Sequence, residues 1–389
     1  KDPLSTMAAL NQIGASINKD DDLVKIKKRS RPFNSPESSI DLGNSGTGIR
    51  LLTGFISGLN LNATLIGDES LSQRPMLRVV NPLVKMGKKI STNDGKTPIK
   101  IKGGSISDNF EYQMPIASAQ VKSSLILASL SSGNSIQITE PKITRDHTEK
   151  MIEYCGGKID VQNSSEGKII TLNKSDLSEI SSYEVVGDFS SAAFIIIAAL
   201  ISKKSKVLIK NVGLNETRIG LLEVLLKMNA DIQIFNKRVI CNEICGDLIV
   251  KSSNLVGIEV PDHIIPNIID EIPILSIAAC FAKGQTIIKN ASELKVKESD
   301  RLNATSMGLR LMKINHELLA DGLIIEGTKN DIEVQGEIDS FGDHRIAMSF
   351  LVAGTRSKDG VMVKNCNNIN TSFPDFCNTM NSLNMSIHE

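Results

Sequence analysis

A phrase that recurs along the chain constrains its fold more than any single motif. The phrase is a small or acidic residue, about a dozen apolar residues at helical density, a turn with Gly, Ser or Lys, and a short β-rich run. It starts at intervals of about 70–80 residues, at Thr47, Ser118, Ser190, Asp270 and Asp343. Ser, Thr and Asp accept hydrogen bonds from the free N–H groups of a helix start. We therefore expect each of these residues to cap a helix that is apolar nearly all round and buried.

A second phrase alternates with the first. It is an amphipathic helix that ends in Gly or Asn, followed by an aliphatic residue that opens a strand. Its copies end at Ile17, Ile90, Ile159, Ile232, Leu318 and Ile387. This phrase occurs once more often than the first, so we expect the chain to open inside a unit. A leading strand–helix–strand segment of about 50 residues is expected to be missing from that unit.

The two phrases together predict six units, each with two helices and several short strands. Buried helices wrapped by sheets and outer helices form a globular α/β body rather than a thin solenoid. A chain of 389 residues is long enough for two domains. We expect three units in each lobe, with the boundary near 183–186: residues 1–184 form the N-terminal lobe and residues 185–389 the C-terminal lobe.

Composition excludes several classes of protein. Apolar residues make up 41% and charged residues 23%, as in globular proteins. Lys+Arg and Asp+Glu both number 44, which argues against non-specific binding to nucleic acid or anionic membranes. The longest apolar run, at 192–201, has the length of a buried helix and not of a membrane span.

The cysteines do not indicate a metal site. Cys241 and Cys245 are close in sequence, but no second pair or nearby His completes a zinc set. The other cysteines are Cys155, Cys280, Cys366 and Cys377. Scattered thiols fit a reducing compartment, and we expect neither a metal nor an organic cofactor.

Several of the expected helix starts carry polar residues that suit anions. Residues 42–48 place Gly43 and Gly46 just before a helix, where backbone N–H groups and the helix dipole favour negative charge. Ser118, Gln120 and Ser190 lie at equivalent starts. Any one of them alone is more typical of a simple N-cap. Because equivalent starts gather at one end of each lobe, together they indicate a cleft that holds anions.

Cationic side chains accompany these starts. They are Arg74, Arg145, Arg218, Lys297, Arg301 and Arg345. An Arg beside the positive end of a helix dipole is unfavourable, so its recurrence there indicates binding of carboxylate or phosphate. The alternative is a set of salt bridges to neighbouring acids, and we assign Arg218 to that alternative.

Two carboxylates are mixed with these cations. Asp270 begins one of the apolar helices, and Glu298 follows Lys297. An acid in a cationic cleft has the features of a general acid or base. Without other information, however, Asp270 is more typical of a helix cap.

At this point the residues resemble a known family, the 5-enolpyruvylshikimate-3-phosphate synthases. The similarity extends from the first residue to about Phe376 and rests on phrases in the family's order. They are GNSGTGIR (43–50), RPM (74–76), SAQVKS (118–123), TRDHTEKM (144–151), GDFSSAA (187–193), KESDRL (297–302), GDHRIA (342–347) and SFP (372–374). Each phrase is weak alone. TRDHTEKM and the IDEIPI run are similar to the bacterial class II branch.

The resemblance implies a fold and a reaction. The fold is a two-domain inside-out α/β barrel built from six βαβαββ repeats. The reaction moves the enolpyruvyl group of phosphoenolpyruvate (PEP) to the 5-hydroxyl of shikimate 3-phosphate and releases phosphate. It also implies a cytoplasmic, monomeric enzyme that glyphosate inhibits.

The resemblance also assigns residues to PEP. Gly46, Arg74 and Gln120 are expected to bind its phosphate, and Arg301 and Arg345 its carboxylate. With four anionic groups on two substrates, cations must offset repulsion and stabilise the charge that develops.

Shikimate 3-phosphate is assigned to residues of both lobes. Ser118 and Arg145 are expected at its phosphate, and Gln120 is also expected to bind this substrate. Lys297 is expected beside its ring and among the catalytic residues. Asp270 is expected to take the proton from the 5-hydroxyl. Glu298, or a lysine in the missing N-terminal segment, is expected to protonate the methylene carbon of PEP.

The sequence departs from the family at its start, where a Lys-Ser pair followed by an Arg is absent. That Lys and Arg contact both substrates in the family, so whether the printed chain is active by itself stays open. Thr371 stands where some members carry Lys. Two alternatives remain: a UDP-N-acetylglucosamine enolpyruvyl transferase, disfavoured because no loop before Tyr183 carries a suitable Cys, and a non-catalytic anion-binding descendant.

Overall fold

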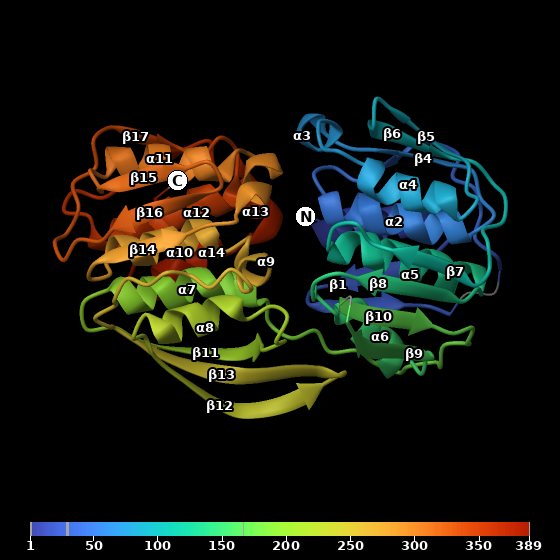
Figure 1. Ribbon diagram of the computed structural model, residues 1–389, viewed down its shortest axis with the longest axis horizontal. Coiled ribbons are helices and arrows are strands. Elements are labelled where there is room, and N and C mark those ends of the chain that lie inside the picture. The colour runs from blue at the N-terminus through green and yellow to red at the C-terminus, as the bar shows by residue number, and fades with distance from the viewer. Residues whose placement is uncertain (1, 29–30, 166, 389) are drawn as a thin grey trace. The chain divides into compact units, whose positions relative to one another are not determined.

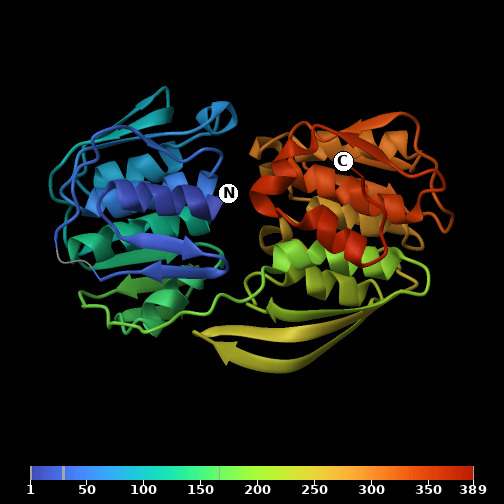
Figure 2. The same ribbon diagram turned by 180° about the vertical axis from the view of Figure 1, so that it is seen from behind.

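The computed structural model describes residues 2–28, 31–165 and 167–388. The chain divides into two compact units, 1–182 and 183–389. The sequence placed this boundary at 184/185. Figures 1 and 2 draw both units from opposite sides.

The first unit contains two sheets that share one strand order. One sheet runs β3 (Ile40–Asp41), β4 (Ala63–Ile66), β6 (Lys96–Ile101), β5 (Ile90–Asn93). The other runs β7 (Phe110–Gln113), β8 (Ile136–Glu140), β10 (Gly167–Leu172), β9 (Ile159–Ser164). In each sheet the first pair of strands is parallel and the other pairs are antiparallel. A separate antiparallel hairpin joins β1 (Ile17–Asp20) to β2 (Leu23–Ile26).

Two buried helices, α2 (Gly46–Gly58) and α5 (Ala119–Ser132), pack against each other inside the first unit. Glycine permits this close approach. A Cβ at Gly54 would lie 1.9 Å from the carbonyl oxygen of Ser124, and one at Gly58 would lie 2.1 Å from that of Ala128. The other helices of this unit are α1 (Asp2–Gln12), α3 (Glu69–Ser72), α4 (Leu77–Lys85) and α6 (His147–Tyr154).

The second unit repeats the same plan. Its sheets run β11 (Lys206–Gly213), β13 (Glu243–Lys251), β12 (Asp231–Ile240), and β14 (Gln285–Ile288), β16 (Gly322–Glu326), β15 (His316–Leu319). Short parallel bridges at Gly187–Val212 and Glu259–Ile287 supply the strand that opens each repeat. A parallel pair, β17 (Glu337–Asp339) and β18 (Met362–Lys364), follows. With these bridges in place of the opening strand, the predicted order strand–helix–strand–helix–strand–strand recurs in the first two repeats of this unit. The third repeat begins at β17 and ends without its two closing strands among the described residues.

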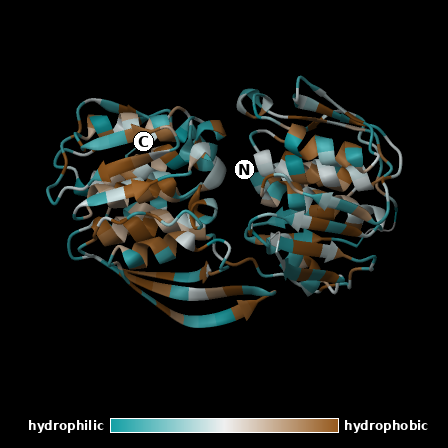
Figure 3. Ribbon diagram, viewed as in Figure 1, coloured by the Kyte–Doolittle hydropathy of each residue, from teal (hydrophilic) through white to brown (hydrophobic). Residues whose placement is uncertain are grey.

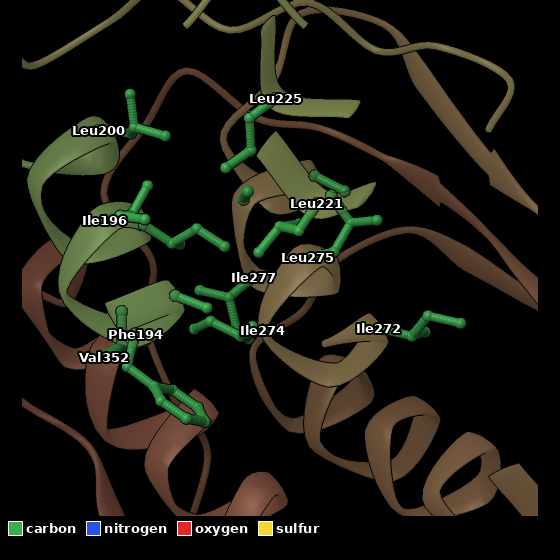
Figure 4. Close-up of a cluster of buried hydrophobic side chains, with 14 of the residues drawn as sticks. Phe194, Ile196, Leu200, Leu221, Leu225, Ile272, Ile274, Leu275, Ile277 and Val352 are labelled. Carbon is green, nitrogen blue, oxygen red and sulfur yellow. The ribbon is translucent and has the colours of Figure 1, made fainter. Parts of the chain in front are cut away.

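Three apolar helices form the core of the second unit. They are α7 (Phe189–Ile201), α10 (Ile272–Cys280) and α12 (His344–Ala353), which pack against one another (Figure 4). Ile196, Leu275 and Ile277 are fully buried there. Burying such a side chain stabilises the fold by about 1.5–3 kcal/mol. This core fixes where the helices begin, and the polar residues of interest lie at those beginnings.

The second helix of each repeat is more polar on one face. In α8 (Gly220–Lys227) the exposed Glu223 and Lys227 pair at 2.9 Å, while Leu221 and Leu225 are buried. Figure 3 shows α7 and α10 in hydrophobic colours and more hydrophilic colours on the outer elements. The remaining elements are α9 (Ile265–Ile268), η1 (Ser292–Val296), α11 (Arg301–Leu311), η2 (Gly354–Arg356), η3 (Cys366–Asn368), α13 (Ile369–Ser372) and α14 (Phe376–Ser382).

Three of the five predicted N-caps were wrong by one or two residues. Ser118 and Asp343 cap α5 and α12, as expected. The caps of α2, α7 and α10 are instead Ser45, Asp188 and Glu271. The side chain of Asp188 accepts hydrogen bonds from two backbone N–H groups, which a cap at Ser190 could not do from inside the helix.

The predicted strand at Ile387 was also wrong. The structure assigns no strand between 383 and 388, and Ile387 is tied to Asn381 by hydrogen bonds instead. Among the described residues, no helix combines the length and the apolar content needed to cross a membrane.

Candidate active site

In the first unit, the start of α2 is built around Gly46. The Ser45 hydroxyl accepts a hydrogen bond from the Gly48 N–H and caps the helix. Arg74 donates to the Asn44 side chain at 2.7 Å, which holds its guanidinium over Gly46. A Cβ at Gly46 would lie 2.8 Å from Arg74 Nη1. Free N–H groups, a helix dipole and a guanidinium therefore meet at one point, which suits an anion such as phosphate.

Gln120 is linked to the same helix start through a residue that the sequence reasoning did not assign. Arg50 Nη1 donates to Gln120 Oε1 at 2.9 Å, and Arg50 Nη2 donates to the Pro75 carbonyl at 3.2 Å. Gln120 Nε2 donates to Thr47 Oγ1 at 2.9 Å. Arg50 lies within the GNSGTGIR phrase and is the one charged residue of α2, where it is buried. That burial is the signal that could have revealed it, because buried Arg residues are paired.

The start of α5 carries Ser118, whose hydroxyl accepts from the Val121 N–H at 3.4 Å. Two residues after Gln120, the buried Lys122 pairs with Glu140 at 3.2 Å and Glu149 at 2.6 Å. Glu140 in turn accepts hydrogen bonds from the backbone N–H and the hydroxyl of Thr144. Thr144 precedes the half-buried Arg145. This charge cluster therefore ties the segment of Arg145 to the helix that carries Ser118 and Gln120, and sequence reasoning missed it.

The cluster contains one more carboxylate than cation, and the titration of Glu149 reflects this. Burial raises the pKa of Glu149, and Lys122 offsets the rise only in part, so the pKa stays above its ordinary value. Oε2 of Glu149 is buried and makes no hydrogen bond with the described residues.

In the second unit, Arg301 is the centre of a carboxylate cluster. Its side chain is 1% exposed. Nε donates to Asp343 at 2.7 Å, Nη1 to Asp270 at 3.2 Å and Nη2 to Glu298 at 2.5 Å. Burial alone would lower the pKa of Arg301, but Asp343, Glu298 and Asp270 outweigh it and raise the pKa. Burial likewise raises the pKa of Asp343, yet Arg301 holds it below its ordinary value.

Asp270 behaves as a member of this cluster and not as a helix cap. The cap position of α10 belongs to Glu271, whose side chain makes no capping bond. Asp270 Oδ1 lies 3.4 Å from Lys297 Nζ and 3.2 Å from Arg301 Nη1. Its side chain is 16% exposed, so a ligand can reach it. The helix-cap alternative for Asp270 is therefore not supported.

Arg345 lies in the first turn of α12 and beside the same cluster. Its Nη1 donates to the Asp270 carbonyl at 3.0 Å and to Glu271 Oε1 at 3.3 Å. Arg218 forms a bidentate pair with Glu271, with both distances 3.0 Å. The ion pair expected of Arg218 is thus confirmed, with Glu271 as its partner. The sequence reasoning did not assign Glu271, because it considered only the neighbouring Asp270 as the functional acid at this helix start.

Each unit therefore gathers its own set of predicted residues. The first unit places Gly46, Arg74, Gln120 and Ser118 at the starts of two packed helices, with Arg145 on a nearby tethered segment. The second unit joins Asp270, Lys297, Glu298, Arg301 and Arg345 in one network. The first set can bind anions. The second combines cations that can bind a carboxylate with acids that can exchange protons.

Comparison with known proteins identifies the family. The profile described as EPSP synthase (3-phosphoshikimate 1-carboxyvinyltransferase) matches residues 1–380. This chain belongs to the EPSP synthase family. The 3-phosphoshikimate 1-carboxyvinyltransferase of Legionella pneumophila (strain Lens) is 42% identical over 392 residues, covering 100% of this chain and 89% of the relative. That of Magnetococcus marinus is 41% identical, covering 100% and 87%.

A solved structure shows the same fold. The EPSP synthase from Acinetobacter baumannii superposes with a TM-score of 0.85 at 39% identity, covering 98% of this chain and 87% of that chain. The predicted fold class, an inside-out α/β barrel of two domains, is confirmed for this EPSP synthase family member. Among the residues that the structure describes, no group of His, Cys, Asp or Glu is arranged to hold a metal ion.

Proposed function

We propose that this member of the EPSP synthase family transfers the enolpyruvyl group of phosphoenolpyruvate to the 5-hydroxyl of shikimate 3-phosphate and releases phosphate. The observation that carries the proposal is the cluster around Arg301, in which a buried guanidinium, Lys297 and Arg345 lie beside Asp270 and Glu298. Relatives that share over 40% of its residues are named for this carboxyvinyl transfer.

We assign the carboxylate of phosphoenolpyruvate to Arg301 and Arg345, and its phosphate to Gly46, Arg74 and Gln120. Arg301 cannot lose its charge, because the surrounding carboxylates raise its pKa. Arg74 and the N-terminal N–H groups of α2 offer a positive site without a Cβ in the way at Gly46. Fixed cations in each set orient the anionic group that they bind.

We assign the phosphate of shikimate 3-phosphate to Ser118 and Arg145, and its ring to Lys297, with Gln120 as a further binding residue. Lys297 Nζ lies 3.4 Å from Asp270 Oδ1. A shikimate ring beside Lys297 would therefore have its 5-hydroxyl within reach of the Asp270 carboxylate. Asp270 takes the hydroxyl proton as the oxygen attacks C2 of phosphoenolpyruvate. Glu298 takes up a proton from solvent when the substrate carboxylate displaces it from Arg301. It gives this proton to C3, which turns the methylene into a methyl group and forms a tetrahedral intermediate.

The second step regenerates the double bond. The methyl group returns one proton to Glu298, and the electron pair of that C–H bond forms the C2=C3 double bond. The C2–O bond to phosphate breaks, and the phosphate leaves with the electron pair of that bond. Cations at the phosphate site stabilise the leaving group, and the charge that develops at C2 is offset by the carboxylates near Arg301. No metal or organic cofactor takes part in these steps.

We also propose that the enzyme acts as a monomer in the cytoplasm and that glyphosate competes with phosphoenolpyruvate. Glyphosate carries a carboxylate and a phosphonate, and the same two sets of cations would bind these groups.

The proposal is tested with the protein produced from its complete gene. Phosphate release is measured with both substrates and with each omitted. We expect release only when both are present. Release without shikimate 3-phosphate, or equal release with a UDP-sugar in its place, would contradict the proposal.

A further inference from the structure

Glu271 is a buried carboxylate outside the set of residues assigned to substrate. Its side chain is 0% exposed at the start of α10. Oε1 accepts from Arg218 Nη2 at 3.0 Å, from Ser190 Oγ at 2.5 Å and from Arg345 Nη1 at 3.3 Å. Oε2 accepts from Arg218 Nη1 at 3.0 Å. Glu271 therefore joins the starts of α7 and α12 to the segment that leads into α8.

The contacts of Arg345 divide its guanidinium into two edges. Nη1 is used by the Asp270 carbonyl and by Glu271. Nε and Nη2 make no hydrogen bond with any residue that the structure describes, and the side chain is 14% exposed. An Arg binds a carboxylate best through two parallel N–H donors. One edge of Arg345 is thus anchored by the protein and the other is available to a ligand.

We propose that Arg218 and Glu271 are positioning residues for Arg345. Arg218 occupies both oxygens of Glu271, so Glu271 holds only one nitrogen of Arg345 and leaves the free edge for the carboxylate of phosphoenolpyruvate. This inference rests on the proposed function, which gives Arg345 that substrate carboxylate. Neither Arg218 nor Glu271 touches the substrate in this account.

The balance of charge explains why Arg218 is needed. A buried carboxylate that loses its cation is strongly unfavourable and recruits another. Without Arg218, the nearest cation to Glu271 is Arg345, which would turn both of its donor nitrogens toward Glu271 and away from substrate. Asp188 belongs to the same cluster: burial raises its pKa, but Arg218 and Arg345 together hold the pKa below its ordinary value.

A purely structural ion pair makes a different prediction. If Arg218 and Glu271 only stabilise the fold, their loss lowers stability and affects both substrates alike or neither. If they position Arg345, their loss affects phosphoenolpyruvate alone. In addition, removing the charge of Glu271 together with Arg218 frees Arg345 again, because a neutral amide accepts one hydrogen bond without drawing a second donor.

The experiment compares Arg218→Met with the double variant Arg218→Met/Glu271→Gln in the protein from its complete gene. KM for each substrate, kcat and thermal stability are measured. We expect Arg218→Met to raise KM for phosphoenolpyruvate about tenfold, with KM for shikimate 3-phosphate within about twofold of wild type. The double variant is expected to recover to within about threefold of wild type.

Arg356→Met is the matched control. Arg356 is also a largely buried Arg of the second unit, 12% exposed, and it donates to Asp331 at 2.7 Å and to the Ile201 carbonyl at 3.0 Å. Its loss removes an ion pair of the same unit, with a more exposed carboxylate, without changing the partners of Arg345. We expect lower stability and an unchanged KM for phosphoenolpyruvate.

The conservative variant Arg218→Lys keeps the charge but offers no fork to both oxygens. It decides the question if Arg218→Met does not fold, and we expect a rise of about threefold in KM for phosphoenolpyruvate alone. An unchanged KM in that variant, or a double variant no better than Arg218→Met, would overturn the inference. Wild-type protein that releases no phosphate would instead overturn the proposed function on which it rests.

Discussion

Glu298 accepts a hydrogen bond from the Arg301 nitrogen that is proposed to bind the carboxylate of phosphoenolpyruvate. Replacing Glu298 should therefore change both substrate binding and turnover. Its Oε2 lies 2.5 Å from Arg301 Nη2. In the proposed reaction Glu298 must leave Arg301 when substrate binds and must then deliver a proton. Glu298→Gln removes both the competing charge and the acid. We therefore expect tighter binding of phosphoenolpyruvate together with slower turnover.

The expected sizes of the changes in KM and kcat follow from the burial of the Glu298–Arg301 pair and from the role of Glu298 as an acid. Arg301 is 1% exposed but Glu298 is 23% exposed. Solvent weakens such a pair to about 1 kcal/mol, below the range for buried charged hydrogen bonds. KM for phosphoenolpyruvate should fall about fivefold. Loss of a general acid should lower kcat by about 10²-fold or more.

Steady-state kinetics give KM and kcat, and calorimetry with glyphosate and shikimate 3-phosphate gives an affinity without turnover. Glu293→Gln is the control, because this substitution removes an equal charge without touching Arg301. Glu293 instead contacts Lys297 at 3.5 Å. An unchanged or weaker affinity in Glu298→Gln would refute the competition at Arg301. Undiminished turnover would assign the acid to another group, such as a lysine.

Three further predictions concern the base, the phosphate site and the effect of pH. Asp270→Asn should lower kcat by about 10²-fold with near-normal affinity for shikimate 3-phosphate in calorimetry, and near-wild-type kcat would remove its catalytic role. In Gly46→Ala a methyl group meets Arg74 Nη1 at 2.8 Å. Inhibition assays should therefore show glyphosate weakened far more than phosphoenolpyruvate, and equal losses would show a backbone requirement only. Burial and then Arg345 lower the pKa of His344 to about 4, although Asp343 raises it in part. Because the unfolded chain binds this proton more readily, the free energy of unfolding should fall by up to about 1.4 kcal/mol per pH unit as pH drops from about 6.5 to about 4. Denaturant titrations of wild type and His344→Asn should show this loss in wild type only, and equal slopes would contradict the assignment.

The repeat could be predicted from the sequence because its signal is local. An apolar helix, a turn and a strand each leave a period in neighbouring residues, so β1, β5 and β9 begin at the predicted Ile17, Ile90 and Ile159. Cap positions were less certain because several capping residues lie close together. Around α7 the chain offers Asp188, Ser190 and Ser191, and only the backbone geometry selects Asp188.

The partners of the charged residues could not be predicted in the same way. Arg50 binds Gln120 and Arg218 binds Glu271, and each pair is separated by a long stretch of chain. A sequence shows that charges exist and that some will be buried, but the fold decides which of them meet. This is why Arg218 was correctly expected in an ion pair while Glu271, its partner, went unnoticed.

The proposed reaction adds the 5-hydroxyl to C2 and a proton to C3 and then releases phosphate. Proton and phosphorus NMR of the reaction in D2O tests this route directly. Because C3 becomes a methyl group before it loses a proton, we expect inorganic phosphate and a product whose vinyl group contains deuterium from the solvent. A product with no deuterium in its vinyl group, or phosphate without that product, would contradict the account.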